Sequence, residues 1–193
     1  AITYGFVSER ELAAVGAPPP VVMLKNPMSE DRTVLRTSLL PGLLDVLGRA
    51  RRHGEQSARL FTIGARFLPP SADAESAGRP RSELDRRVLP EERPSFAAVL
   101  AGPRPSHLRR PEETDVLDAK GLAVELVERL SGQTPQVTVA SPEERPFHLH
   151  PRGAAFLALG PVRVGSFGPL HPDVDDALDL NGPAQIGELD LAA

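Results

Sequence analysis

Two carboxylates near the end of the sequence, Glu188 and Asp190, are the first candidates for chemistry. They lie two residues apart in a segment where apolar residues alternate, so a strand would place both on one face. Two carboxylates on one face can work as a general acid and a general base. The alternative is that they form salt bridges at the edge of a sheet, and the sequence leaves both interpretations open.

Arginines supply the next candidates. Arg32 and Arg36 are four apart, just before a helical pattern, and such a pair can hold a phosphate or carboxylate through bidentate hydrogen bonds. The alternative pairs them with neighbouring acidic residues or with an acidic partner surface. A nucleotide site built on strands would have to use Arg66 and Arg163.

Histidines could form a metal site. His148 and His150 would share one face of a strand, and His171 is a possible third ligand. No carboxylate motif accompanies them at a recognisable spacing, so hydrogen-bonded structural histidines are the alternative. The sequence has no Cys, no glycine-rich phosphate loop and no nucleophile elbow. We therefore expect no catalytic, cofactor-binding or metal-binding residue in this chain.

The elements that position these residues follow from the spacing of apolar side chains. A capping box at Ser8 and Glu11 predicts a short helix that ends near Gly16. Amphipathic helices are predicted over residues 38–52 and around residues 119–130, where Gly132 ends the pattern, and a short helix is predicted over 172–178. Strands are predicted at residues 21–24, 61–67, 96–101, 137–139, 154–159, 162–167 and 186–191. The pattern of 61–67 predicts that Phe61, Ile63, Ala65 and Phe67 face a core.

Residues 69–94 are rich in Pro, Ser, Ala and charged side chains, which predicts a long flexible surface loop. Strands joined by hairpins and single helices indicate an α+β fold with a mostly antiparallel sheet flanked by helices. We expect one domain over residues 1–193, with the Pro-rich segment as an insertion at about 69–94.

Charge is distributed unevenly along the chain. Residues 1–111 carry a net charge of +5 and residues 112–193 one of −9. A basic half suits an RNA-binding module, although aromatic residues make up only 4% of the chain and offer few surfaces for base stacking. The lack of Cys and of any long apolar run predicts a cytoplasmic protein without a membrane span.

Several segments carry a family resemblance. The stretch NPMSEDRTVLRTSLLPGLL at residues 26–44 resembles a signature of the phenylalanyl-tRNA synthetase β-subunit family. The resemblance continues in order through ITYGFVS (2–8), RLFTIGARF (59–67), DVLDAKGLAVELVERL (115–130), HLHPRGAA (148–155), VGSFGPLHPDV (164–174) and IGELDL (186–191). The family usually has Glu at the position of Thr62 and Arg at that of Ala65.

The resemblance implies a non-catalytic domain that resembles the class II aminoacyl-tRNA synthetase core. In this family such a domain pairs with the catalytic α subunit in a heterotetramer that aminoacylates tRNA(Phe). ATP and Mg would then belong to the parent enzyme, and this fragment would hold no cofactor and be inactive alone. The alternatives are a free-standing or diverged synthetase-like protein that activates a small acid, and the RNA-binding module.

The resemblance also implies where the partner subunit binds. The run from Asn26 to Arg52 corresponds to the part of class II cores that commonly forms dimer contacts. The predicted interface residues, apolar and charged, are Met28, Arg32, Leu35, Arg36, Leu39 and Leu40. An ordinary core position is the alternative for Leu39 and Leu40.

Overall fold

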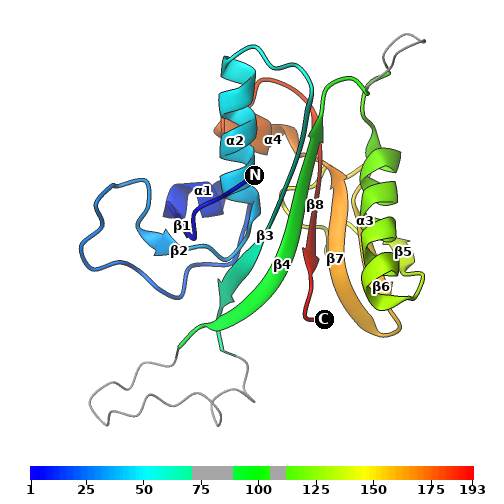
Figure 1. Cartoon of the computed structure of the whole chain (residues 1–193), viewed down its shortest axis with the longest axis horizontal. Helices are drawn as coiled ribbons and strands as arrows, with labels where there is room; N and C mark the ends of the chain where they lie inside the picture. Colours follow the sequence, from blue (N-terminus) through cyan, green and yellow to red (C-terminus); the bar gives the residue numbers. More distant parts are fainter. Residues whose placement is uncertain (71–88, 105–111) are drawn as a thin grey trace.

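A six-stranded antiparallel sheet forms the centre of the molecule (Figure 1). The computed structural model describes residues 1–70, 89–104 and 112–193. The strand order is β3-β4-β8-β7-β6-β5, and a separate small sheet pairs β1 with β2. The strands are β1 (Phe6–Val7), β2 (Val34–Leu35), β3 (Ala58–Leu68), β4 (Glu91–Ala101), β5 (Gln136–Val139), β6 (Ala155–Leu159), β7 (Val162–Pro169) and β8 (Ala184–Asp190). The helices are α1 (Glu9–Ala14), α2 (Leu40–Arg52), α3 (Val116–Ser131) and α4 (Pro172–Ala177). The predicted α+β fold with a mostly antiparallel sheet is confirmed.

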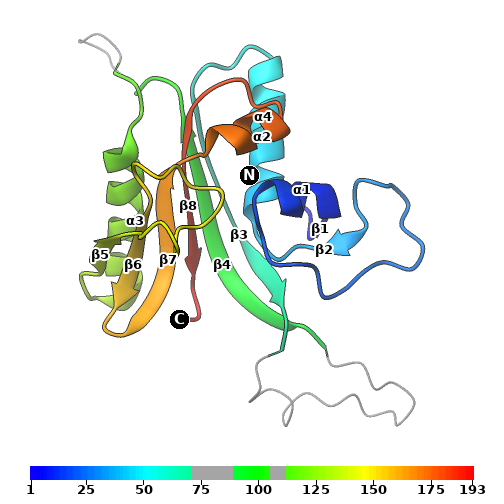
Figure 2. The ribbon, with the colours of Figure 1, turned by 180° about the vertical axis from the view of Figure 1, so that it is seen from behind.

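The two faces of the sheet carry different layers, because alternate residues of a strand point to opposite sides. On one side, Ala97 and Val99 of β4 share a core with the leucines of α2 and with Val174 of α4. On the other side, Phe96 and Ala98 belong to a separate core with α3, which packs on β7 and β8. Figure 2, from behind, shows α4 beside α2 at one end of the sheet. Each face therefore has a core of its own.

The predicted helix boundaries agree closely with the structure. The capping box is present, with Ser8 and Glu11 exchanging hydrogen bonds at the start of α1. Helix α2 has its proline in the first turn, where the missing N–H has no partner to lose, and arginines in its last turn. Helix α3 ends at Gly132, whose φ of 70° is a left-handed conformation that glycine adopts without strain.

The prediction that the apolar side chains of residues 61–67 face a core is wrong for Phe61 and Ile63. Their side chains are 56% and 62% exposed, whereas Thr62 between them is only 3% exposed. The reason is that Arg36 and Leu39 lie over the Thr62 side of β3, so that side is the inner one. Alternation shows that two faces differ, but it does not show which one is covered.

The prediction of a buried strand at residues 21–24 is also wrong. Met23 makes only an isolated bridge with Val34, and its side chain is 63% exposed. The segment runs along the outside of β2, to which it is hydrogen-bonded through Val22 and Leu24. A two-residue strand offers too little surface to bury it.

Strand β4 begins earlier than predicted. It starts at Glu91, so residues 91–94 belong to the sheet, while residues 71–88 of the predicted loop lie outside the described residues. Pro94 is tolerated because its backbone faces the end of β8, where the Leu191 N–H donates to its carbonyl. The pairing of β4 with β8 ends at Ser95 and Asp190, one residue before Pro94. The missing N–H of Pro94 therefore removes no hydrogen bond from that strand pair.

Candidate interaction site and the polar cluster beside it

The suggested acid–base pair lies in a buried polar cluster at one end of the sheet. Glu188 projects from β8 toward the start of α2, where the Ser38 hydroxyl donates to its two oxygens at 3.0 and 3.2 Å. The backbone N–H of Leu39 donates to the same carboxylate at 2.6 Å. Glu188 thus acts as a hydrogen-bond acceptor for the beginning of a helix.

Asp190 is held in a similar way by two arginines. Its Oδ2 atom lies 3.3 Å from Arg66 Nη2 of β3 and 2.9 Å from Arg93 Nη1 of β4. Hydrogen bonds to Glu91 and Asp190 raise the pKa of Arg93 above its ordinary value. The salt-bridge interpretation therefore holds for this carboxylate. Its strand is not at the sheet edge, however, because β8 lies between β4 and β7.

Arg66 and Arg163 line one open cleft of about 210 Å³, together with Phe156, Glu188 and Asp190. Arg163 stacks over the Phe156 ring, with its guanidinium carbon 3.6 Å from the ring centre, and forms an ion pair with Glu144 at 3.3 Å. The two arginines named as nucleotide candidates are thus brought together. Each arginine already forms an ion pair with an acidic side chain of the same chain.

Arg36 is a buried structural residue and does not form a clamp with Arg32. Its Nε donates to the Ala65 carbonyl at 2.9 Å, and its Nη1 donates to the Thr3 hydroxyl at 2.9 Å and to the Tyr4 carbonyl at 3.1 Å. Burial lowers the pKa of Arg36, and the nearby Glu188 charge opposes that shift. This guanidinium joins the N-terminal segment to β3.

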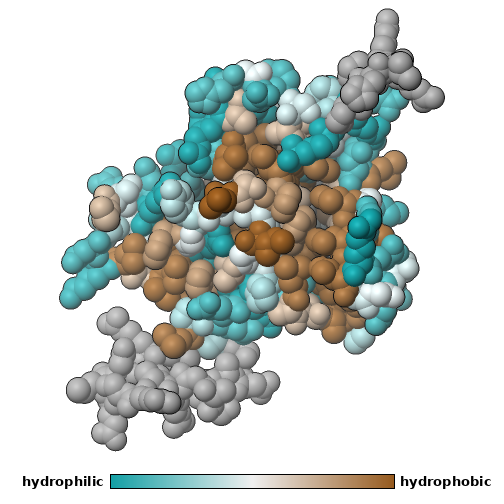
Figure 3. Space-filling model, in the orientation of Figure 1, coloured by the Kyte–Doolittle hydropathy of each residue, from teal (hydrophilic) through white to brown (hydrophobic). Residues whose placement is uncertain are grey.

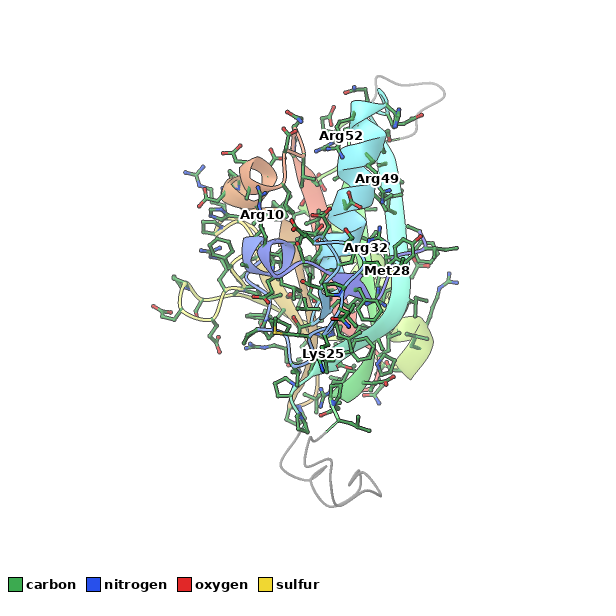
Figure 4. The ribbon with its side chains drawn as sticks, turned by 90° about the vertical axis from the view of Figure 1, so that its left-hand side faces the viewer. Arg10, Lys25, Met28, Arg32, Arg49 and Arg52 are labelled. Atoms are coloured by element: carbon green, nitrogen blue, oxygen red, sulfur yellow. The ribbon has the colours of Figure 1, made fainter. Side chains whose placement is uncertain are left out.

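Arg32 and Met28 lie on the outside of the molecule, along the side that Figure 4 faces. The Arg32 guanidinium lies over the Tyr4 ring, 3.8 Å from its centre, and the Met28 side chain is fully exposed. A cleft of about 510 Å³ beside them is lined by Tyr4, Arg32, Asp45 and Arg49, among others. An exposed Met next to a cleft of mixed polarity is suited to contact another protein.

The predicted interface residues therefore separate into two groups. Met28 and Arg32 are exposed and Leu35 is half-buried, so these three can touch a partner. Leu39 and Leu40 are fully buried in the core beneath α2, and Arg36 is buried and hydrogen-bonded within the chain, so we correct the prediction for these three. The reason for the two leucines is that the first turn of α2 packs directly on the sheet, which favours the core alternative.

The histidines do not lie on a strand, contrary to the prediction. Residues 142–144 and 147–148 form turns, and Leu149 makes only an isolated bridge with Leu170. His148 points inward, with its Nδ1 3.0 Å from the Val15 carbonyl, and burial lowers its pKa. The Nδ1 atoms of His150 and His171 accept backbone N–H groups at 3.1 and 3.2 Å. These contacts match the alternative of hydrogen-bonded structural histidines.

Sequence reasoning missed two residues. Arg93 falls within the predicted Pro-rich loop, although its spacing of two residues from Ser95 puts it on the inner face of β4. No sequence signal distinguishes Gln185 from other polar strand residues. Its Oε1 atom is buried, and no hydrogen-bond donor among residues 1–70, 89–104 and 112–193 reaches it.

None of the helices in the described part of the chain combines the length and the hydrophobicity that a membrane span needs.

Comparison with known proteins gives a consistent result. Residues 1–191 match the family model described as the phenylalanyl tRNA synthetase beta chain CLM domain. The phenylalanine–tRNA ligase beta subunit of Novosphingobium aromaticivorans is 35% identical over 99% of this chain and 22% of its own length. Those of Clostridium tetani and Brucella abortus are 30% and 32% identical, over 98% and 94% of this chain. The chain spans about a fifth of the length of these relatives.

Among solved structures, pyrrolysyl-tRNA synthetase from Desulfitobacterium hafniense has a similar fold. Its TM-score is 0.66, with 14% sequence identity over 99% of this chain and 60% of that one. At this identity the likeness is one of fold. It confirms that the sheet and its flanking helices are arranged as in an aminoacyl-tRNA synthetase.

Proposed function

The chain belongs to the family of the phenylalanyl-tRNA synthetase β chain, and on that premise we propose that it is a non-catalytic assembly domain of phenylalanine–tRNA ligase. It would form one unit over residues 1–193 and pair with the α subunit. The assembled ligase would aminoacylate tRNA(Phe) in the cytoplasm, with ATP and Mg bound elsewhere in the enzyme.

The observation that carries the proposal is the state of the Glu188–Asp190 pair. Both side chains are about nine-tenths buried, and both are engaged by the chain's own donors. A general acid or base needs hydrogen-bond access to a substrate proton. Here the same positions hold α2, β3, β4 and β8 together, which supports a structural role for the pair and a non-catalytic domain.

The partner would bind on the side of Met28, Arg32 and Leu35. These residues combine an exposed flexible thioether, a guanidinium held over an aromatic ring and a half-buried leucine. Apolar contact at the centre with charge at the rim is the usual composition of a protein interface. Arg49 and Asp45, which form an i,i+4 ion pair on α2, border the same cleft.

Association with the α subunit of the same organism tests the proposal. The chain and the α subunit are co-expressed, and the complex is measured by size-exclusion chromatography with light scattering. We expect a stable complex that elutes ahead of either component. A chain that folds yet never associates with the α subunit contradicts the proposal.

One observation favours a second function, the activation of a small acid by a diverged synthetase. Arg66 and Arg163 line the same cleft, and arginines that converge on a cleft can hold a phosphate. Acid-dependent exchange of pyrophosphate into ATP by the chain alone would support this second function.

A further inference from the structure

Half of one sheet face lies open beside α3. Helix α3 packs on β7 and β8, and no described residues form a helical layer over the β3–β4 half of the same face. That half carries apolar side chains of two paired strands. We call it the β3–β4 face; Phe96 and Ala98 form its floor and are buried against α3, and its accessible residues are Phe61, Ile63, Ala65, Phe67, Pro94 and Leu100.

The exposure of this face is large for a sheet interior. Ile63 is 62% exposed and Phe61 is 56% exposed, although Phe61 stacks on Phe96 with ring centres 6.0 Å apart. On the α3 side the face is bounded by Leu122, which is 37% exposed. Figure 3 shows a broad apolar area over β3 and β4 in the middle of this side. Contiguous apolar surface of this kind marks a site that another molecule covers.

The shape of the face selects a helix as the occupant. Two strands span about 10 Å, the diameter of one α-helix, and residues 59–67 extend over about 26 Å. Strand addition at the edge of β3 is blocked, because Arg36 Nε donates to the Ala65 carbonyl and the Phe67 N–H donates to the Arg36 carbonyl. The occupant therefore lies on the face and not along the edge.

Charges at the two ends give the helix a direction. Arg59 stands at one end of the face, and Glu92, paired with Phe67, stands at the other. Apolar residues occupy the positions between them. A helix whose positive N-terminus lies near Glu92 and whose negative C-terminus lies near Arg59 is electrostatically complementary to this arrangement.

We propose that the β3–β4 face docks an amphipathic helix of the α subunit, whose apolar stripe covers Phe61 and Ile63. The identity of the partner rests on the proposed function. Strand β3 also connects this face to Arg36, next to the predicted interface residue Leu35. One partner that wraps around the edge of β3 would contact both regions.

Binding and cross-linking in the complex with the α subunit test the proposal. Ile63→Asp should weaken association more than tenfold, as expected for an apolar residue at an interface centre. Val139→Asp is the matched control, since Val139 is 82% exposed on β5 at the far edge of the sheet, and it should change the affinity by less than about twofold. A benzophenone amino acid in place of Ile63 should cross-link to a helix of the α subunit. Circular dichroism verifies that each variant is folded.

The outcomes separate this inference from the proposed function. A wild-type chain that does not bind the α subunit overturns both. A wild-type chain that binds, with Ile63→Asp binding equally well, overturns only the docking site. Cross-links that join position 63 to a second copy of the chain, or to another segment of the same polypeptide, also overturn it.

Discussion

The backbone N–H of Leu39 donates a 2.6 Å hydrogen bond to the Glu188 carboxylate, across 149 positions of sequence. Leu39 is the residue that precedes α2, and it has no side-chain oxygen with which to cap the helix. Glu188 supplies the missing acceptor from β8 and places a negative charge at the positive end of the helix. The start of α2 is therefore attached to the central part of the sheet.

Glu188→Gln should lower the free energy of unfolding by about 2 kcal/mol, because it removes the charge that strengthens the hydrogen bonds from Ser38 and Leu39. Urea denaturation measures the change. Glu143→Gln is the control, since Glu143 is exposed and its loss should cost less than about 0.5 kcal/mol. Equal effects of the two substitutions would contradict the capping role.

Leu39→Asp should unfold the chain or destabilise it by more than about 4 kcal/mol, because Leu39 is fully buried and a buried unpaired charge is costly. Met28→Asp should leave the melting temperature unchanged and weaken association with the α subunit. Thermal melts by circular dichroism and a binding assay separate the two effects. A folded Leu39→Asp variant would show that the first turn of α2 does not belong to the core.

Stability should fall as the pH drops below about 6.5, the ordinary pKa of histidine. Burial lowers the pKa of His148 in the folded state, with Arg145 acting in the same direction and Glu188 in the opposite one. At pH values between the folded and the unfolded pKa, the unfolded chain binds more protons than the folded chain does. The contribution of His148 to the free energy of unfolding is therefore fully present above pH 6.5 and is lost as the pH falls below it.

The slope within that window approaches about 1.4 kcal/mol per pH unit for one proton. Urea denaturation from pH 7.5 to 5 measures it. His148→Asn, whose amide can still donate to the Val15 carbonyl, should flatten the profile in this range. A profile that His148→Asn leaves unaltered would assign the pH dependence to other groups.

Gly64→Ala should destabilise the chain by about 1–3 kcal/mol, since a Cβ there collides with the Arg36 guanidinium and disturbs its hydrogen bonds. Gly121→Ala is a matched control with the opposite expected sign. Gly121 lies within α3 with open space around it, so alanine should stabilise the helix by about 1 kcal/mol. Melting temperatures of the two variants give the comparison.

The chain alone should show no phenylalanine-dependent exchange of pyrophosphate into ATP. The reason is that its candidate carboxylates and arginines bind one another. An exchange assay on a pure preparation measures this. Exchange that persists through purification and disappears in Arg66→Ala would refute the non-catalytic role.

Local signals in the sequence predicted much of the fold. Capping at Ser8, the leucine spacing of α2 and Gly132 after α3 each depend on neighbouring residues, and each prediction is confirmed. The inner face of β3 could not be predicted, because it is decided by Arg36, which lies 29 positions from Ala65 in sequence. Strands β1 and β2 have two residues each, too few for any period to be visible.

The site was harder to predict than the fold for a related reason. Glu188, Asp190 and Arg66 were each identified by residue type, but only the pairing of β3, β4 and β8 brings them together. Gln185 resembles any polar strand residue in the sequence. Its unpaired oxygen exists only because α3 covers it.

Strand β8 has a consequence for the way this chain is made. It lies between β4 and β7, yet it is the last strand in the sequence. During synthesis the hairpin of β3 and β4 and the meander of β5 to β7 emerge first, and each then has a free edge where β8 will later insert. The six-stranded sheet is completed only after residues 184–190 have emerged from the ribosome. A nascent chain that stalls before them leaves the edges of β4 and β7 without a partner strand, and unpaired edges of this kind promote aggregation.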